Sequence, residues 1–130
     1  MSYYFSKIVS GKSFDEVIEL VTAELKKEGF GVVTEIDMKD TLKKKIDVDF
    51  RKYKILGACH PQYAYNVLMA EDKIGVFLPC NVVVQETENG TIEVFAVDPI
   101  ASMISVKNES LMDIALEVQQ KMKNVIANIN

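Results

Sequence analysis

The sequence is poor in cysteine, proline and glycine and has no long apolar run. Its 130 residues include two cysteines, three prolines and six glycines, too few for a disulfide scaffold or for a collagenous or low-complexity chain. Its apolar runs stay below the ~18 residues that a membrane-spanning helix needs, and its first residues lack the charged-then-apolar order of a signal peptide. We therefore expect a single domain over residues 1–130, located in the cytoplasm and without a membrane partner.

An excess of either charge is also lacking. The 15 lysine and arginine residues stand against 19 aspartate and glutamate residues, which gives a net charge of −4. A nucleic-acid-binding domain typically carries a basic excess, so we expect no nucleic-acid partner. Hydrophobic residues make up 48% of the chain and charged residues 26%, the composition of a globular domain that is long enough to bury one core.

Most catalytic signatures are missing as well. The sequence has no P-loop, no Gly-x-Ser-x-Gly elbow, no His-Glu-x-x-His and no Cys-x-x-Cys. Its carboxylates show no spacing that indicates an acid–base pair. The sequence therefore gives no positive sign of an enzyme.

What is present is an alternation of strand and helix patterns. The clearest helix begins after Ser13, which forms a capping box with Glu16, and ends at Gly29. Asn89-Gly90 predicts a hairpin, and Pro79 marks an edge, a bulge or the true beginning of the strand that follows. The expected strands cover 3–9, 30–36, 53–59, 75–85 and 91–97, and the expected helices cover 14–28, 38–47, 61–70 and 109–127.

This order of elements predicts an α+β fold. It ends in a hairpin and a long helix, and it lacks the Gly-rich first turn of a dinucleotide-binding fold. We expect two layers, a largely antiparallel sheet with helices packed mainly on one face. The alternative is an α/β doubly wound sheet.

Reactive side chains concentrate around the two cysteines. Cys59 and the only histidine, His60, precede Pro61, a residue suited to the first position of a helix, so the helix dipole would favour a thiolate at Cys59. Cys80 follows Pro79 at a strand start, so both thiols are expected at the same end of the sheet. There they would be within reach of a disulfide, or would face a soft metal ion such as zinc or copper together with His60.

The competing interpretation is that both thiols are simply packed. Free cysteine is among the most buried residue types, and apolar residues surround Cys59 and Cys80 in the sequence. In that case Pro61 starts a helix, Gly75 permits a turn and the cysteines fill core volume. A closed zinc site would also need a fourth ligand, for which Asp98 is the candidate.

Four segments resemble the small prokaryotic family named domain of unknown function three hundred and two. The segments are 29–37, 53–61 with Ala64, 75–84 and 98–99, and together they span nearly the whole chain. The resemblance implies a compact two-layer α+β fold, pairing as a dimer, a cytoplasmic location and no assigned activity. Residue by residue, the family motif falls on Cys59, Pro61, Ala64, Gly75, Pro79, Cys80 and Asn81.

One position departs from the family pattern. Where the family often has asparagine between cysteine and proline, this chain has His60. Asparagine is a good N-cap and a poor metal ligand, so the resemblance does not imply a Cys-His metal pair throughout the family.

Two functions remain open from the sequence. The first is a small non-catalytic homodimer that binds a small molecule or a protein in a pocket near Cys59 and Cys80. The second is a thiol-based protein, binding a soft metal or doing redox chemistry, with Cys59 as the more reactive thiol and Cys80 as its partner. The candidate site residues are Cys59, His60, Pro61, Ala64, Gly75, Pro79, Cys80 and Asn81.

Overall fold

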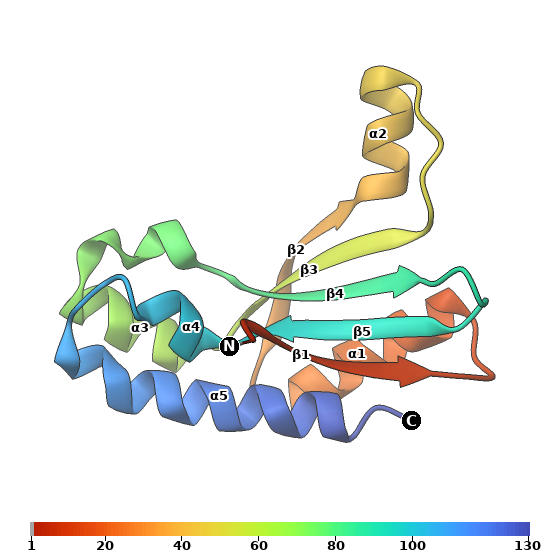
Figure 1. Ribbon diagram of the computed structural model, residues 1–130. Coiled ribbons are helices and arrows are strands. Elements are labelled where there is room, and N and C mark those ends of the chain that lie inside the picture. The colour runs from red at the N-terminus through yellow and green to blue at the C-terminus, as the bar shows by residue number, and fades with distance from the viewer. Residues whose placement is uncertain (1) are drawn as a thin grey trace.

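The computed structural model describes residues 2–130 and is built around a five-stranded sheet (Figure 1). The strands are β1 (Tyr4–Val9), β2 (Gly31–Asp37), β3 (Tyr53–Cys59), β4 (Cys80–Glu86) and β5 (Ile92–Val97). Their spatial order is β1-β5-β4-β3-β2, and every neighbouring pair is antiparallel. The predicted α+β fold is confirmed. The doubly wound alternative is wrong because it requires parallel strands.

Helices and short 3₁₀ turns connect the strands. The helices are α1 (Phe14–Lys27), α2 (Met38–Ile46), α3 (Pro61–Ala70), α4 (Pro99–Met103) and α5 (Met112–Ala127), and the 3₁₀ turns are η1 (Asp72–Phe77) and η2 (Glu109–Leu111). Figure 1 shows α1 and α5 along one side of the sheet, while α2 stands away from the rest of the chain. Among residues 2–130, none of the helices has the length and apolar character needed to traverse a bilayer.

Local chemistry sets the ends of α1. The Glu16 backbone N–H donates to Ser13 Oγ at 3.1 Å, and the Ser13 backbone N–H donates to Glu16 Oε1 at 3.1 Å, which is the predicted capping box. Gly29 follows the helix with φ of +88°, a left-handed conformation that favours glycine. The helix therefore begins and ends where the sequence predicts.

The region before β4 differs from the expected strand over 75–85. Residues up to Phe77 form η1, and the strand begins at Cys80. Because Pro79 has no N–H to donate to a ladder, it stands immediately before the strand. The hairpin between β4 and β5 is as predicted, with Gly90 at φ of +79°.

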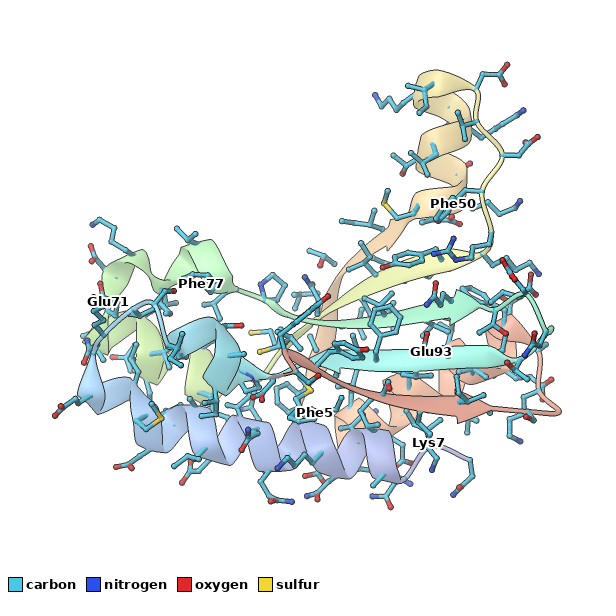
Figure 2. All side chains as sticks on the ribbon, viewed as in Figure 1. Phe5, Lys7, Phe50, Glu71, Phe77 and Glu93 are labelled. Carbon is cyan, nitrogen blue, oxygen red and sulfur yellow. The ribbon has the colours of Figure 1, made fainter. Side chains whose placement is uncertain are left out.

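Helices α1 and α5 bury one face of the sheet. Figure 2 shows Phe5 and Lys7 of β1 beside α5, where Lys7 Nζ donates to the Ala127 carbonyl at 2.9 Å. The main hydrophobic cluster joins both helices to the sheet, and its members include Val17, Val21, Leu25, Leu56, Val82, Val84, Val94, Val118, Met122 and Ile126. Burial of these apolar side chains stabilises the two layers against each other.

A second, smaller hydrophobic cluster lies beyond the end of the sheet. Its buried members are Val67 of α3, Ile74 of η1 and Leu111 of η2. Ile114 of α5 packs against both clusters. The helix α5 therefore connects the two-layer body to the group formed by α3, η1 and α4.

The face of the sheet opposite α1 and α5 carries apolar side chains, and we call it the open face. Tyr4, Phe95 and Tyr53 form a row of rings with centroids 6.1 and 6.2 Å apart. Exposure remains high at Tyr4, 41%, and at Ile8, 53%. By strand register, the apolar residues of this face are Tyr4, Ile8, Ile36, Tyr53, Ile55, Val83, Phe95 and Val97.

Candidate functional site

A cavity of about 320 Å³ lies between the end of the sheet, α3, α4 and the first half of α5. The sheet end contributes Phe30, Ala58, Cys59 and Cys80 to its wall, and α3 contributes Tyr63, Ala64, Val67 and Leu68. The remaining wall comes from the residues Leu78, Pro79, Met103, Leu111, Ile114, Ala115 and Val118, among others. In the described part of the chain, no aspartate, glutamate, lysine or arginine lines this cavity.

Both cysteines border the cavity because their strands are neighbours. Cys59 ends β3 and Cys80 begins β4, and Ala58 lies directly opposite Cys80 in the antiparallel register. Burial raises the pKa of the Cys80 thiol to about 11, with a smaller contribution from the nearby Cys59. Cys80 is therefore a protonated thiol at neutral pH, because desolvation penalises its charged form.

The two thiols and His60 do not fit the zinc or copper ion that belongs to the alternative, thiol-based function. Nowhere in residues 2–130 do three or more His, Cys, Asp or Glu side chains form a group able to hold a metal ion. Cys59 and Cys80 border the same cavity, but a closed zinc site needs four ligands, and these residues do not supply them.

Asp98, the candidate fourth ligand, has other partners. Its Oδ1 accepts from the Ile100 backbone N–H at 3.0 Å and from Gln119 Nε2 at 3.0 Å. The first bond caps α4 and the second joins that cap to α5. Asp98 therefore fixes the helix that carries Met103 to the cavity wall.

His60 is held by aromatic packing. It occupies the N-cap position of α3, as predicted, but its side chain makes no capping hydrogen bond. Its ring centroid lies 5.4 Å from that of Phe30 and 4.2 Å from that of Tyr63. A Cβ at Gly29 would lie 2.7 Å from His60 Nε2, so the absence of a side chain at Gly29 makes room for the imidazole.

His60 and Tyr63 each bring a polar group to this part of the wall. His60 Nδ1 is buried and has no hydrogen-bond partner within the described residues. Burial raises the pKa of Tyr63, and a hydrogen bond and negative charge from Glu117 of α5 raise it further. The Tyr63 phenol therefore stays neutral at physiological pH.

A family model for the domain of unknown function DUF302 matches residues 5–129. The chain belongs to the DUF302 family. It is also similar to the crystal structure of an uncharacterized conserved DUF302 protein from Bacillus stearothermophilus, with a TM-score of 0.91 and 30% sequence identity over 100% of both chains. No curated protein matches the chain. Membership of the DUF302 family establishes the fold and no activity.

The structure brings together most of the candidate site residues. Cys59, His60, Ala64, Pro79 and Cys80 all line the cavity. The other candidates, Pro61, Gly75 and Asn81, lie outside it: Pro61 is the first residue of α3, Gly75 is exposed in η1, and Asn81 is exposed in β4 opposite Gly57. The DUF302 motif thus contributes one part of a larger apolar wall.

The rest of the wall was not identified from the sequence. Ile114, Ala115 and Val118 belong to the expected helix 109–127, which we did not connect with the site, and Val118 also packs in the main cluster. Periodicity reports which residues are buried and not whether a space lies beside them. The small side chains of Ala64 and Ala115, both lining the cavity, are the one signal in the stripes that this DUF302 chain leaves room between α3 and α5.

Proposed function

We propose that this protein is a single-domain, non-catalytic binder of a small molecule, which it holds in the cavity near Cys59 and Cys80. The observation that carries the proposal is a cavity of about 320 Å³ whose wall is drawn from the sheet and from α3, α4 and α5. Ligand pockets typically have volumes of roughly 300–1,000 Å³ and mostly apolar walls. The cavity opens to solvent and is lined almost entirely by apolar side chains, so a ligand can reach it and bury apolar surface there.

The chemistry of the wall supports binding over thiol-based activity. The thiolate is the nucleophilic and metal-binding form of cysteine, and burial of Cys80 disfavours that form. The raised pKa of Tyr63 likewise keeps this side chain neutral. A protonated thiol at Cys80 and a neutral phenol at Tyr63 suit the retention of a molecule better than its conversion.

Filling the cavity should abolish binding while the fold is kept. The Ala64→Leu variant adds three carbons at the cavity wall of α3, and we expect it to lose the thermal stabilisation that fragment-sized ligands give the wild type. At a ligand concentration 100 times its dissociation constant, binding stabilises a protein by about 2.7 kcal/mol. This corresponds to a shift of several degrees in melting temperature for a chain of this size.

The matched control is Ala23→Leu, because Ala23 is exposed on α1. This variant should respond to every fragment as the wild type does. If no member of a fragment library shifts the wild type, or if Ala64→Leu responds equally, the cavity is not a ligand site.

We also propose that the protein acts in the cytoplasm as a homodimer joined through the open face. Monomeric proteins rarely expose large contiguous apolar patches, and the apolar residues of this face extend over all the strands of the sheet. Three polar side chains at one edge of this face bond to each other: Arg51 Nε donates to Gln85 Oε1 at 2.8 Å, and Gln85 Nε2 donates to Glu93 Oε1 at 2.8 Å. The open face of a second copy is equally apolar, and it is the partner that we propose.

The Ile8→Lys variant should separate the proposed dimer. Ile8 lies on the open face and is 53% exposed, so a lysine there leaves the monomer intact while placing a charge in the interface. Light scattering should give twice the 14.6 kDa chain mass for the wild type and the single mass for the variant. The Leu116→Lys control, 50% exposed on α5, should remain a dimer. A wild type of single-chain mass would refute the pairing.

A further inference from the structure

The cavity wall excludes ionised ligands. Apart from its two thiols, the wall contains only His60 and Tyr63 as ionisable side chains, and everything else is hydrocarbon or thioether. An ion that leaves water for such surroundings loses its hydration and gains no countercharge from an aspartate, glutamate, lysine or arginine side chain. The portion of a ligand that enters this cavity is therefore uncharged.

The wall also favours an aromatic ligand over an aliphatic one. One side presents the rings of Phe30, His60 and Tyr63, with centroids 5.4 and 4.2 Å apart. Sulfur atoms come from Cys59, Cys80 and Met103. Rings attract other rings in edge-to-face and offset arrangements, and sulfur makes favourable contacts with ring edges, so both groups add to simple apolar burial only when the ligand is aromatic.

The volume of the cavity limits the size of the ligand. An apolar cavity of roughly 150 Å³ binds benzene, and this cavity has about 320 Å³. Two fused six-membered rings therefore match the space, whereas one ring leaves much of it empty.

From these three observations we infer that the cavity takes an uncharged aromatic ligand of about two fused rings. The inference rests on the proposed function and names its ligand class. A charged substituent of such a ligand remains at the cavity mouth, because no aspartate, glutamate, lysine or arginine lines the wall.

Three naphthalene-sized probes test the assignment by isothermal titration at pH 7. The probes are 2-naphthol, which is neutral and aromatic, decahydro-2-naphthol, which is neutral and aliphatic, and 2-naphthoate, which is aromatic and anionic. We expect 2-naphthol to bind at least about tenfold more tightly than 2-naphthoate, because burial penalises the charge. We expect it to bind about threefold to tenfold more tightly than the saturated alcohol, the size of an aromatic pair contribution.

Two variants locate the effect. Tyr63→Leu should reduce the preference for 2-naphthol over decahydro-2-naphthol, because one ring of the wall is gone. Ala64→Leu should abolish binding of both alcohols, and the exposed control Ala23→Leu should leave all affinities unchanged.

The possible failures are distinguishable. Equal binding of the two alcohols overturns the aromatic assignment and leaves the cavity as a ligand site. Binding of 2-naphthoate as tight as that of 2-naphthol overturns the uncharged assignment in the same way. If none of the probes binds and no fragment stabilises the wild type, the proposed function fails together with this inference.

Discussion

Iodoacetamide should alkylate Cys80 at least about 100-fold more slowly in the folded protein than in the unfolded chain at pH 7.5. Burial, and then the neighbouring Cys59, raises the pKa of Cys80 from its ordinary value of 9.0 to about 11. Each unit of increase lowers the thiolate fraction tenfold, and only the thiolate attacks the reagent. Timed alkylation with and without urea, followed by peptide mass spectrometry, measures the rate for each cysteine.

The Cys59→Ser variant separates the two causes of this protection. Because burial is the larger cause, Cys80 should remain slow to react when Cys59 is replaced. A Cys80 thiol that reacts equally fast in folded and unfolded protein would contradict the expectation. The thiol-based function would then be better supported than ligand binding.

The same pKa shift predicts how stability depends on pH. The pKa of Cys80 is higher in the folded state than in the unfolded state, so its contribution to stability is complete below pH 9 and is lost as the pH rises towards 11. The stability advantage of the wild type over Cys80→Ala should therefore shrink across this interval, by on the order of 2–3 kcal/mol. Urea unfolding of both proteins at several pH values measures the difference.

The Gly57→Ala substitution should lower the free energy of unfolding by about 1–3 kcal/mol, the usual cost of overpacking. Gly57 of β3 lies opposite Thr34 of β2. A Cβ at Gly57 would collide with the Thr34 side chain and would lie 2.6 Å from Cγ of Pro79. The added methyl group must therefore push apart β2 and the segment that leads into β4, and urea denaturation should report the loss.

A double-mutant cycle with Thr34→Ala identifies the origin of this loss. Alanine at 34 removes the nearer obstacle, so Gly57→Ala should cost less in that background, while the contact with Pro79 remains. Gly31→Ala is the matched strand control, because nothing lies within 4 Å of a Cβ built at Gly31. If the two glycine substitutions destabilise equally, steric conflict at Gly57 is not the cause.

Helices and hairpins whose ends are set by particular capping or turn residues could be predicted from the sequence. Helix α1 has its capping box at Ser13 and its left-handed stop at Gly29, and the β4–β5 hairpin has Asn89-Gly90. The segment 75–79 could not, because its apolar run suits a strand as well as a 3₁₀ turn. Helix α4 was missed because its five residues are too few to show a helical period.

The site was predictable where the chain itself brings residues together. Cys59 and Cys80 adjoin because the sheet is antiparallel and one strand ends where the next begins. The role of His60 was not predictable, because its ring packs against Phe30, which precedes a different strand. The ring also needs the space that Gly29 leaves by having no side chain. Such contacts between distant segments leave no spacing in the sequence.

The division of the interior into two clusters has a consequence for motion. The smaller cluster has only Val67, Ile74 and Leu111 as buried members, so separating α3, η1 and α4 from the body costs much less than unfolding the sheet. The cavity lies on that boundary, so we expect the wall formed by α3, η1 and α4 to be the part that adjusts when a ligand binds. Backbone amides of α3 should therefore exchange with deuterium faster than those of β4, and a guest that touches both sides should slow the faster set most.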